Sequence, residues 1–359
     1  MFRMHRLFVL SILLVVLLSL SAFVGLAQDE EEEEEFTTPG ALFEVEGEYT
    51  MATVVKLTGI AWFDRMETGI AWLGEDYPTV TAFQQGPAQA DAALQVQVIE
   101  DLLAQGVDAV CVVPFQPETV ESVLARAMEE GVVVITHEAS NQENVDFDIE
   151  AFDNAGYGIH LMEHLAERMD YEGEYTVFVG SLTSQTHNEW VDAAIEFQRE
   201  NYPDMTFVGD KNESFDDPQV AYERMQELLI AYPNLRGVQG SASTDVVGVG
   251  QAVEEAGLED VISVVGTSLP SISRDLINTG AVDLISFWDP ALAGYACNQV
   301  ALMVLEGTLP EELLEGELPE DGFGFENIPG YEEMTIDGSV LFGQAWVDVT
   351  IDNVDDWDF

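Results

Sequence analysis

Short continuous apolar runs alternate with longer helical segments along this chain, and this alternation constrains its fold most. The runs VDAVCVVP (107–114) and VVVIT (132–136) are largely apolar at consecutive positions, so both faces of each strand would be apolar. The helical segments before these two runs end at glycine, at Gly106 and Gly131. Strands that are apolar on both faces are buried on both sides. The pattern therefore predicts a parallel sheet with helices on both faces.

The alternation occurs twice, in two sets of similar length. One set of strands and helices begins near residue 50, and a second set fills residues 157–288. A further helix follows over 289–307, and the tail is strand-rich and irregular. With 359 residues, 47% of them hydrophobic, the chain has enough apolar material for two domains. The predicted fold class is α/β, with two doubly wound parallel-sheet lobes.

The N-terminus has the features of an export signal. Arg3 and Arg6 precede a long apolar run, and Gly25 and Ala27 supply the small residues expected before a cleavage site. We therefore predict a signal peptide over residues 1–27 and a periplasmic or extracellular protein. The alternative is an uncleaved membrane tether, because about 20 apolar residues can span a bilayer. Residues 28–49, which include six consecutive glutamates, are predicted to be an acidic linker.

The charge balance excludes some partners. The chain has 68 acidic residues against 11 Lys and Arg, a formal net charge of -57. Nucleic acids and anionic membrane surfaces need clustered cations, so neither is an expected partner. The acidity is interpreted as a solvated coat. Cys111 and Cys297 lie in a strand pattern and a helix pattern, which favours two small buried residues over a disulfide.

The ends of the predicted strands carry the candidate site, because ligands of open parallel sheets bind beyond the carboxyl ends of the strands. Lys56, which is one of only two lysines, follows the first strand. Tryptophans occur at three of these ends. Aromatic rings can pack against the apolar faces of a ligand, and charged or amide groups can bind its polar atoms. The candidates are Lys56, Trp62, Phe63, His137, Glu138, Thr186, His187, Asn188, Trp190, Ser241, Ser243, Trp288 and Asp289.

At these positions the sequence resembles the type I periplasmic sugar-binding proteins of ABC transporters, in the branch of rhamnose-binding and autoinducer-2-binding proteins. The segments that carry the resemblance include VVKLTGIAWFDRMETG, TSQTHNEWVDAA and GTSLPSISRDLINTGAVDLISFWDPALAGYACNQVAL. The resemblance implies two lobes joined by a three-crossover hinge, with ligand closed between them. It places residues 50–149 plus 289–320 in the first lobe and 150–288 plus 321–359 in the second. It also implies an ABC permease as partner, a monomer, no cofactor and no enzymatic activity.

The same resemblance assigns roles residue by residue. It places a ligand-contacting lysine at Lys56, an aromatic wall at Trp62–Phe63, and a hydroxyl-binding carboxylate at Glu138. The branch usually has Trp-Asp where this chain has His137–Glu138. Its autoinducer-2 contacts are replaced here by Thr186–His187, before Asn188 and Trp190, and by Ser241 and Ser243. A neutral pentose, hexose or deoxyhexose such as rhamnose is therefore expected rather than autoinducer-2.

Other interpretations stay open from the sequence. Lys56 could close strand ends as an ion pair, Trp190 and Trp288 could be core residues, and Asp289 before Pro290 could cap a helix. The same pocket could serve a chemotaxis or kinase sensor. The motif HLMEH, with His160, Glu163 and His164, matches the H-x-x-E-H pattern of zinc hydrolases and is the remote alternative.

Overall fold

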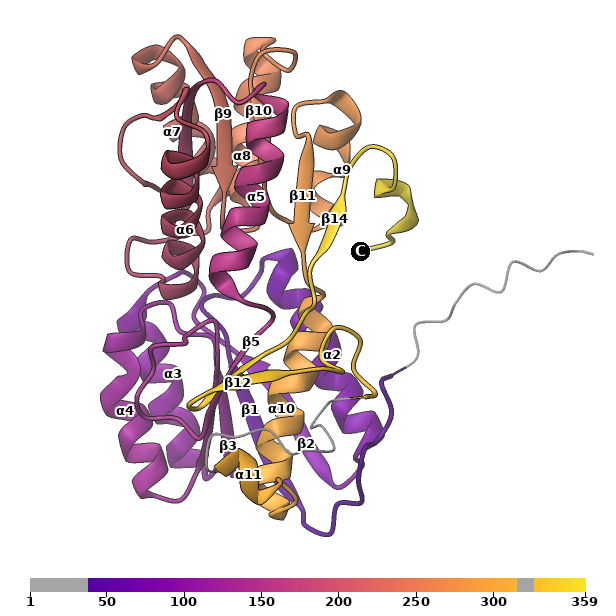
Figure 1. Ribbon diagram of the computed structural model, residues 1–359. Coiled ribbons are helices and arrows are strands. Elements are labelled where there is room, and N and C mark those ends of the chain that lie inside the picture. Colours follow the sequence, from indigo (N-terminus) through magenta and orange to yellow (C-terminus); the bar gives the residue numbers. More distant parts are fainter. Residues whose placement is uncertain (1–37, 315–325) are drawn as a thin grey trace, which may run out of the picture. The chain divides into compact units, whose positions relative to one another are not determined.

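The computed structural model describes residues 38–314 and 326–359 (Figure 1). The predicted signal peptide, residues 28–37 of the predicted linker, and residues 315–325 lie outside the described residues. Within the two described ranges, no helix is both long and apolar enough to cross a membrane.

Two sheets organise the described chain. The strands of the first sheet are β1 (Tyr49–Val54), β2 (Val80–Gln85), β3 (Ala109–Val112), β4 (Val133–His137), β5 (Phe147–Glu150), β12 (Thr335–Asp337) and β13 (Val340–Phe342). Those of the second are β6 (Gly173–Val179), β7 (Met205–Phe207), β9 (Leu235–Gly240), β10 (Ser263–Thr267), β11 (Leu284–Phe287) and β14 (Val347–Val349), with β8 (Asn212–Glu213) paired to β6. The strand orders are β12-β13-β5-β4-β3-β1-β2 and β14-β11-β10-β9-β6-β7. All pairs are parallel except β12–β13 and β11–β14.

Helices cover both faces of each sheet, which confirms the predicted fold class (Figure 1). The first lobe contains α2 (Ala61–Asp76), α3 (Ala92–Gln105), α4 (Pro117–Glu129), α10 (Pro290–Glu306) and α11 (Glu311–Leu314). The second contains α5 (Asn154–Arg168), α6 (Gln185–Asn201), α7 (Pro218–Ala231), α8 (Asp245–Ala256), α9 (Pro270–Thr279) and the 3-10 turn η1 (Val354–Asp356). Helices α2 and α10 pack together on one face of the first sheet, and α3 and α4 on the other.

The central strands β3, β4 and β5 of the first sheet are buried on both faces, and in β3 neighbouring side chains enter different cores. Val110 and Val112 of β3 pack in the core with α3 and α4, whereas Cys111 between them joins the core that contains α2 and α10. Cys111 and Cys297 are both buried free cysteines. The fully apolar sequence of β3 is therefore a direct consequence of its two covered faces.

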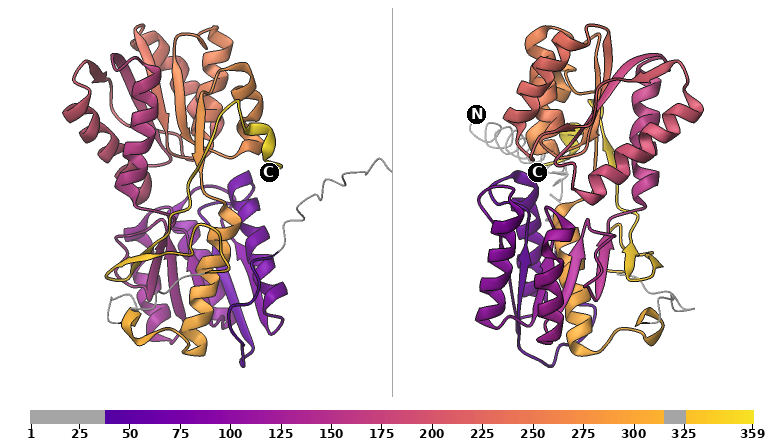
Figure 2. Two further views of the ribbon diagram at one scale, coloured as in Figure 1. Left: turned by 45° about the vertical axis from the view of Figure 1, so that its right-hand side comes forward. Right: turned by 90° about the vertical axis from the view of Figure 1, so that its left-hand side faces the viewer.

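The chain crosses between the lobes three times, in the segments 151–153, 288–289 and 343–346 (Figure 2). The first and third crossovers lie side by side, because the Gly343 amide donates to the Glu150 carbonyl at 2.9 Å and the Ala345 amide donates to the Ala151 carbonyl at 3.1 Å. In the second crossover, Trp288 directly follows β11 in the sequence, and the chain then enters the first lobe, where α10 begins at Pro290.

The tail differs from the expectation that residues 321–359 belong to the second lobe. β13 pairs in parallel with β5, and β12 pairs with β13, so both strands extend the first sheet. Only from β14 onward does the tail join the second lobe. Each of these strands has three residues. Such short strands carry no periodicity from which a lobe could be assigned.

The end of the predicted linker is also part of the first lobe. The Thr38 hydroxyl donates to Asp76 at 2.6 Å, the Gly40 amide donates to the same carboxylate at 2.8 Å, and the Leu42 amide donates to the Tyr77 hydroxyl at 2.8 Å. Residues 38–42 therefore pack against the end of α2. The predicted linker boundary at residue 49 lies too far along the chain, because these contacts begin at Thr38.

Candidate functional site

A small cavity lies where the strand ends of the two sheets face each other. Its volume is about 20 Å³, enough for a water molecule but not for a sugar ring. The first lobe supplies side chains that follow β1 and β4 or lie at the start of α2. The second supplies side chains that follow β8, β9 and β11, that end β10 or that lie at the start of α6. The lining residues are Lys56, Ile60, Trp62, Phe63, Glu138, His187, Asp216, Ser241, Ser243, Thr267 and Trp288.

A buried ion pair lies at the centre of the first-lobe wall. The Lys56 Nζ is 2.5 Å from the Glu138 Oε2, and each side chain is only 4% exposed. Burial alone would lower the pKa of Lys56, but the carboxylates of Glu138 and Asp216 raise it overall. Burial would raise the pKa of Glu138, but Lys56 lowers it overall. Both groups are therefore held in their charged forms by each other.

Two acidic residues of the cavity have a left-handed backbone conformation. Glu138 has φ 60° and Asp216 has φ 55°. Residues with a Cβ rarely adopt this conformation, and such strain concentrates at functional sites. Gly180 makes room for Asp216, because a Cβ on Gly180 would lie 2.9 Å from both of its carboxylate oxygens. Burial raises the pKa of Asp216, and Lys56 opposes that rise.

Two buried histidines flank the ion pair as neutral rings. Burial lowers the pKa of His187 to about 3, and the Gly180 amide donates to its Nδ1 at 3.1 Å. The neutral ring therefore carries its proton on Nε2. Burial also lowers the pKa of His137, whose Nδ1 lies 2.5 Å from the Ile149 carbonyl. That contact requires the His137 proton on Nδ1, which leaves Nε2 as a hydrogen-bond acceptor.

An aromatic cluster joins the two lobes at Trp288. The ring of Trp288 meets Trp62 of the first lobe edge to face, with centroids 4.6 Å apart. It also lies 5.7 Å from Trp190 of the second lobe and 5.1 Å from Phe152 of the first crossover. Because Trp288 is itself on the second crossover, its position depends on the relative placement of both lobes.

Several buried polar atoms at this site have no hydrogen-bond partner in the described part of the chain. They are the Trp288 Nε1, the Ser241 Oγ and the His137 Nε2. Trp288 and Ser241 line the cavity directly, and the His137 Nε2 lies 3.9 Å from Glu138. A buried polar group without a partner costs about 1–3 kcal/mol. The Trp288 Nε1 and the Ser241 hydroxyl are thus available to a ligand in the cavity.

The structure brings together most of the residues predicted from the sequence. Lys56, Trp62, Phe63, Glu138, His187, Ser241, Ser243 and Trp288 line the cavity. Lys56 and Glu138 also form the ion pair that was the alternative explanation for Lys56. The two interpretations of Lys56, as a ligand-binding residue and as an ion pair, therefore do not exclude each other.

The other predicted residues lie outside the cavity. Asp289 caps α10 by accepting from the Ala291 amide and pairs with Arg65 at 2.6 Å. Trp190 is core, and its Nε1 donates to Asn154 at 2.8 Å. The remaining three are held by neighbours: Thr186 donates to Glu150, Asn188 donates to the Ser181 and Ser184 carbonyls, and His137 lies behind Glu138. The strand-end rule does not state which face of α6 meets the cavity, so it could not distinguish Thr186 and Asn188 from His187 between them.

Three lining residues were missed from the sequence: Ile60, Asp216 and Thr267. Thr267 ends β10 and could have been found by the strand-end rule that found Ser241. Asp216 follows β8, which has only two residues and gives no strand pattern. Its position at the cavity depends on a turn that composition does not predict.

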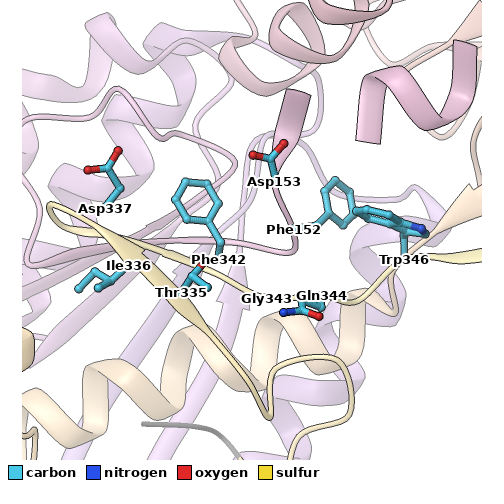
Figure 3. Close-up of a pocket in the computed structure, with 9 residues that line it drawn as sticks. All are labelled: Phe152, Asp153, Thr335, Ile336, Asp337, Phe342, Gly343, Gln344 and Trp346. Atoms are coloured by element: carbon cyan, nitrogen blue, oxygen red, sulfur yellow. The ribbon is translucent and has the colours of Figure 1, made fainter. Parts of the chain in front are cut away.

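A larger cavity of about 630 Å³ lies beside the first and third crossovers (Figure 3). Its lining residues are Phe152, Asp153, Thr335, Ile336, Asp337, Phe342, Gly343, Gln344 and Trp346. Asp153 caps α5, and the rings of Phe152 and Trp346 lie 5.3 Å apart. None of the charged pairs described above faces this cavity. The smaller cavity is therefore the candidate binding site, despite its size.

A pair of buried carboxylates lies on β5, directly before the hinge. Asp148 accepts from the Thr136 hydroxyl at 2.6 Å, and Glu150 lies two residues further on the same face of the strand. Burial raises the pKa of Asp148 to about 7 and raises that of Glu150 well above its ordinary value, to which the Asp148 charge also contributes. The pair therefore retains a proton near neutral pH.

We expect Asp148→Asn to flatten the pH dependence of stability. In the folded protein Asp148 keeps a proton that the unfolded chain has released above about pH 3.8. The contribution of this protonated carboxyl to the free energy of unfolding is therefore complete below that pH and is lost as pH rises to about 7. Between about pH 5 and pH 7 the loss is about 2–3 kcal/mol, at 1.36 kcal/mol per unit. In urea unfolding, the free energy of unfolding of the variant should rise relative to that of the wild type from about pH 5 to pH 8.

The exposed Asp260→Asn is the matched control for that measurement, since it removes one carboxylate from the surface. We expect it to follow the wild type at every pH. An Asp148→Asn profile parallel to the wild type would contradict a proton held on this pair.

Comparison with known proteins supports a common architecture. A family model described as a periplasmic binding protein domain matches residues 51–309. A solved ABC transporter solute binding protein from Clostridium phytofermentas, with bound L-rhamnose, superposes with a TM-score of 0.76 at 19% identity, over 86% of this chain and 98% of that chain. At that identity, the structural likeness concerns the fold alone.

Curated relatives match over different lengths. The D-apiose import binding protein of Actinobacillus succinogenes is 31% identical over 140 residues, which are 36% of this chain and 42% of that protein. The match thus spans less than half of that relative. The D-allose-binding periplasmic protein of Escherichia coli is 23% identical over 257 residues, 68% of this chain and 80% of that protein.

Proposed function

Because the chain belongs to the periplasmic binding protein domain family, we propose that it captures a small neutral sugar between its lobes and delivers it to an ABC permease. Members of this family bind solutes and are not enzymes. The expected ligand is a pentose, hexose or deoxyhexose such as rhamnose. Relatives named for D-apiose and D-allose support this ligand class.

The unpaired buried polar atoms of the cavity are the observation that carries this proposal. Two such atoms line the cavity: the Trp288 Nε1 donates, and the Ser241 hydroxyl can both donate and accept. A sugar hydroxyl also donates and accepts, so one polyol can satisfy both. The rings of Trp62 and Trp288 supply apolar surface for the C–H faces.

The charges of the cavity favour a neutral ligand. Lys56 is the one basic side chain among the lining residues that carries a charge, and Glu138 already neutralises it. Asp216 adds a carboxyl group whose pKa is raised by burial. An anionic ligand would therefore meet carboxylates without a free cation, whereas hydroxyls can donate to those carboxylates in charged hydrogen bonds.

Hinge closure is the proposed mechanism. The cavity is too small for a sugar, so entry requires the lobes to separate about the three crossovers. A ligand that contacts Lys56 and Glu138 on one lobe and Ser241 on the other stabilises the closed form by its differential affinity. The permease would then recognise the closed form.

The proposed site of action is outside the cytoplasmic membrane. Residues 1–27 would serve as a signal peptide, or as a tether if they are not cleaved, and the acidic segment after them would act as a spacer. We propose that the protein acts as a monomer. Ligand sensing for chemotaxis would use the same cavity, and uptake of labelled sugar by cells with and without the gene separates transport from sensing.

A thermal-shift screen of monosaccharides tests the function. We expect one or a few neutral sugars to raise the melting temperature, with saturation at one sugar per protein in calorimetry. Tryptophan fluorescence should change with the same midpoint, because Trp62 and Trp288 line the cavity. The proposal fails if no pentose, hexose or deoxyhexose binds while a charged solute does.

A further inference from the structure

A second cluster of titratable side chains lies away from the cavity, on the second lobe. His160 and His164 are one turn apart on α5 and therefore share a face of the helix. The His160 Nε2 is 2.9 Å from both carboxylate oxygens of Asp348 on β14, and the His164 Nε2 is 3.4 Å from the Asp348 Oδ2. Two imidazole nitrogens thus converge on one carboxylate.

The spacing of these atoms matches that of metal ligands. Ligand atoms from the three side chains lie within 4.8 Å of one another. In a tetrahedral zinc site with bonds of about 2.0–2.1 Å, ligand atoms lie about 3.3 Å apart. Small side-chain rotations would bring the three atoms to that spacing. Two histidines and one carboxylate are also a ligand set that zinc commonly uses, with a fourth position for water.

The side chains of the cluster are partly exposed to solvent, but neighbouring residues restrict their rotation. Its side chains are 21%, 29% and 32% exposed for His160, His164 and Asp348, so an ion can reach them. The ring of Trp346 stacks on His160 at 5.5 Å and restricts its rotation. Arg168 donates to the His164 Nδ1 at 3.3 Å and to the His164 carbonyl at 3.0 Å. Metal on Nε2 would require a proton on Nδ1, so the first of these contacts would be lost and the second kept.

The location connects the cluster to the hinge. Helix α5 starts directly after the first crossover, and β14 starts directly after the third (Figure 1). A link between His160, His164 and Asp348 would therefore join the two segments by which these crossovers enter the second lobe. Glu163, the glutamate of the H-x-x-E-H motif, is exposed on the helix and is not part of the cluster. The arrangement fits metal binding rather than hydrolysis.

We propose that His160, His164 and Asp348 form a binding site for a divalent transition metal of the zinc class, which fastens strand β14 to helix α5 beside the hinge. The sequence motif supplied two of the ligands. Asp348, 188 residues from His160 in the sequence, supplies the third.

Calorimetric titration of the untagged full chain with Zn²⁺ tests the site, in millimolar Mg²⁺ to saturate the acidic surface. We expect one ion per chain, with a dissociation constant in the micromolar range or below. His160→Asn, His164→Asn and Asp348→Asn should each weaken binding by more than about tenfold, because each removes a ligand. The matched control is Glu163→Gln, which should bind as the wild type does. Equal binding by all four variants would mean that zinc binds only the acidic coat, and would overturn the proposal.

A second measurement does not depend on the folding of the ligand variants. Cu²⁺ bound at this cluster should quench Trp346, whose ring stacks on His160. We expect a stoichiometric quenching phase in the wild type that is lost in Trp346→Phe. Equal quenching in both proteins would place the ion elsewhere and contradict the site.

Discussion

Lys56→Met will lower both stability and sugar affinity, and it is expected to have one of the two largest effects of any single change in the cavity. The variant leaves Glu138 buried and unpaired, although each side chain of the pair is only 4% exposed in the wild type. Breaking a buried pair from one side costs about 3–5 kcal/mol of unfolding free energy. Loss of the lysine donor should weaken sugar binding by a further ~1–3 kcal/mol. Urea unfolding and calorimetry measure the two effects separately.

The chain offers a matched control, because Lys211 is its other lysine. Lys211 pairs with Asp192 at 2.8 Å, its side chain is 21% exposed, and it lies outside the cavity. Lys211→Met should cost about 1 kcal/mol or less and leave sugar affinity unchanged. The double variant Lys56→Met/Glu138→Gln should regain stability but not affinity. Wild-type affinity in Lys56→Met would remove the lysine from the site.

Trp288→Ala is expected to have the other largest effect. Trp288 is 2% exposed and contacts rings of both lobes, including Trp62 at 4.6 Å and Trp190 at 5.7 Å. Removal of a buried Trp side chain costs about 3–5 kcal/mol of unfolding free energy. Sugar binding should fall below detection in calorimetry, because the variant loses an aromatic wall and the Nε1 donor together. Trp288→Phe, which keeps a ring but not the donor, should bind with intermediate affinity.

The neighbouring Phe287→Ala separates folding from binding. Phe287 is fully buried, but its ring packs against Trp357 and Phe359, on the other side of the strand from the cavity. We expect a similar loss of stability with sugar affinity close to that of the wild type. If both alanine variants lose binding equally at a temperature where both are folded, Trp288 has no special role at the site.

The residues of the candidate site that lie at strand ends could be predicted from the sequence, but the directions of the side chains on its helices could not. Glu138, Ser241 and Trp288 each follow a strand directly, and Lys56 lies two residues after β1, so the strand pattern predicted their position at the cavity. On α6 the same rule could not tell His187 from Asn188, because it does not state which face of the helix meets the cavity. Asp216 was missed because the backbone that positions it is a strained turn after a two-residue strand.

The sequence by itself determined the doubly wound α/β architecture and its division into two sets of strands and helices. The reason is local: strands covered on both faces are largely apolar, as in β3, and several of the helices between them end at glycine, as α3 does at Gly106. The tertiary structure alone decided which lobe takes each tail strand, that Lys56 pairs with Glu138, and that Asp348 meets His160 and His164. These outcomes depend on contacts between residues far apart in the chain, for which no local pattern exists.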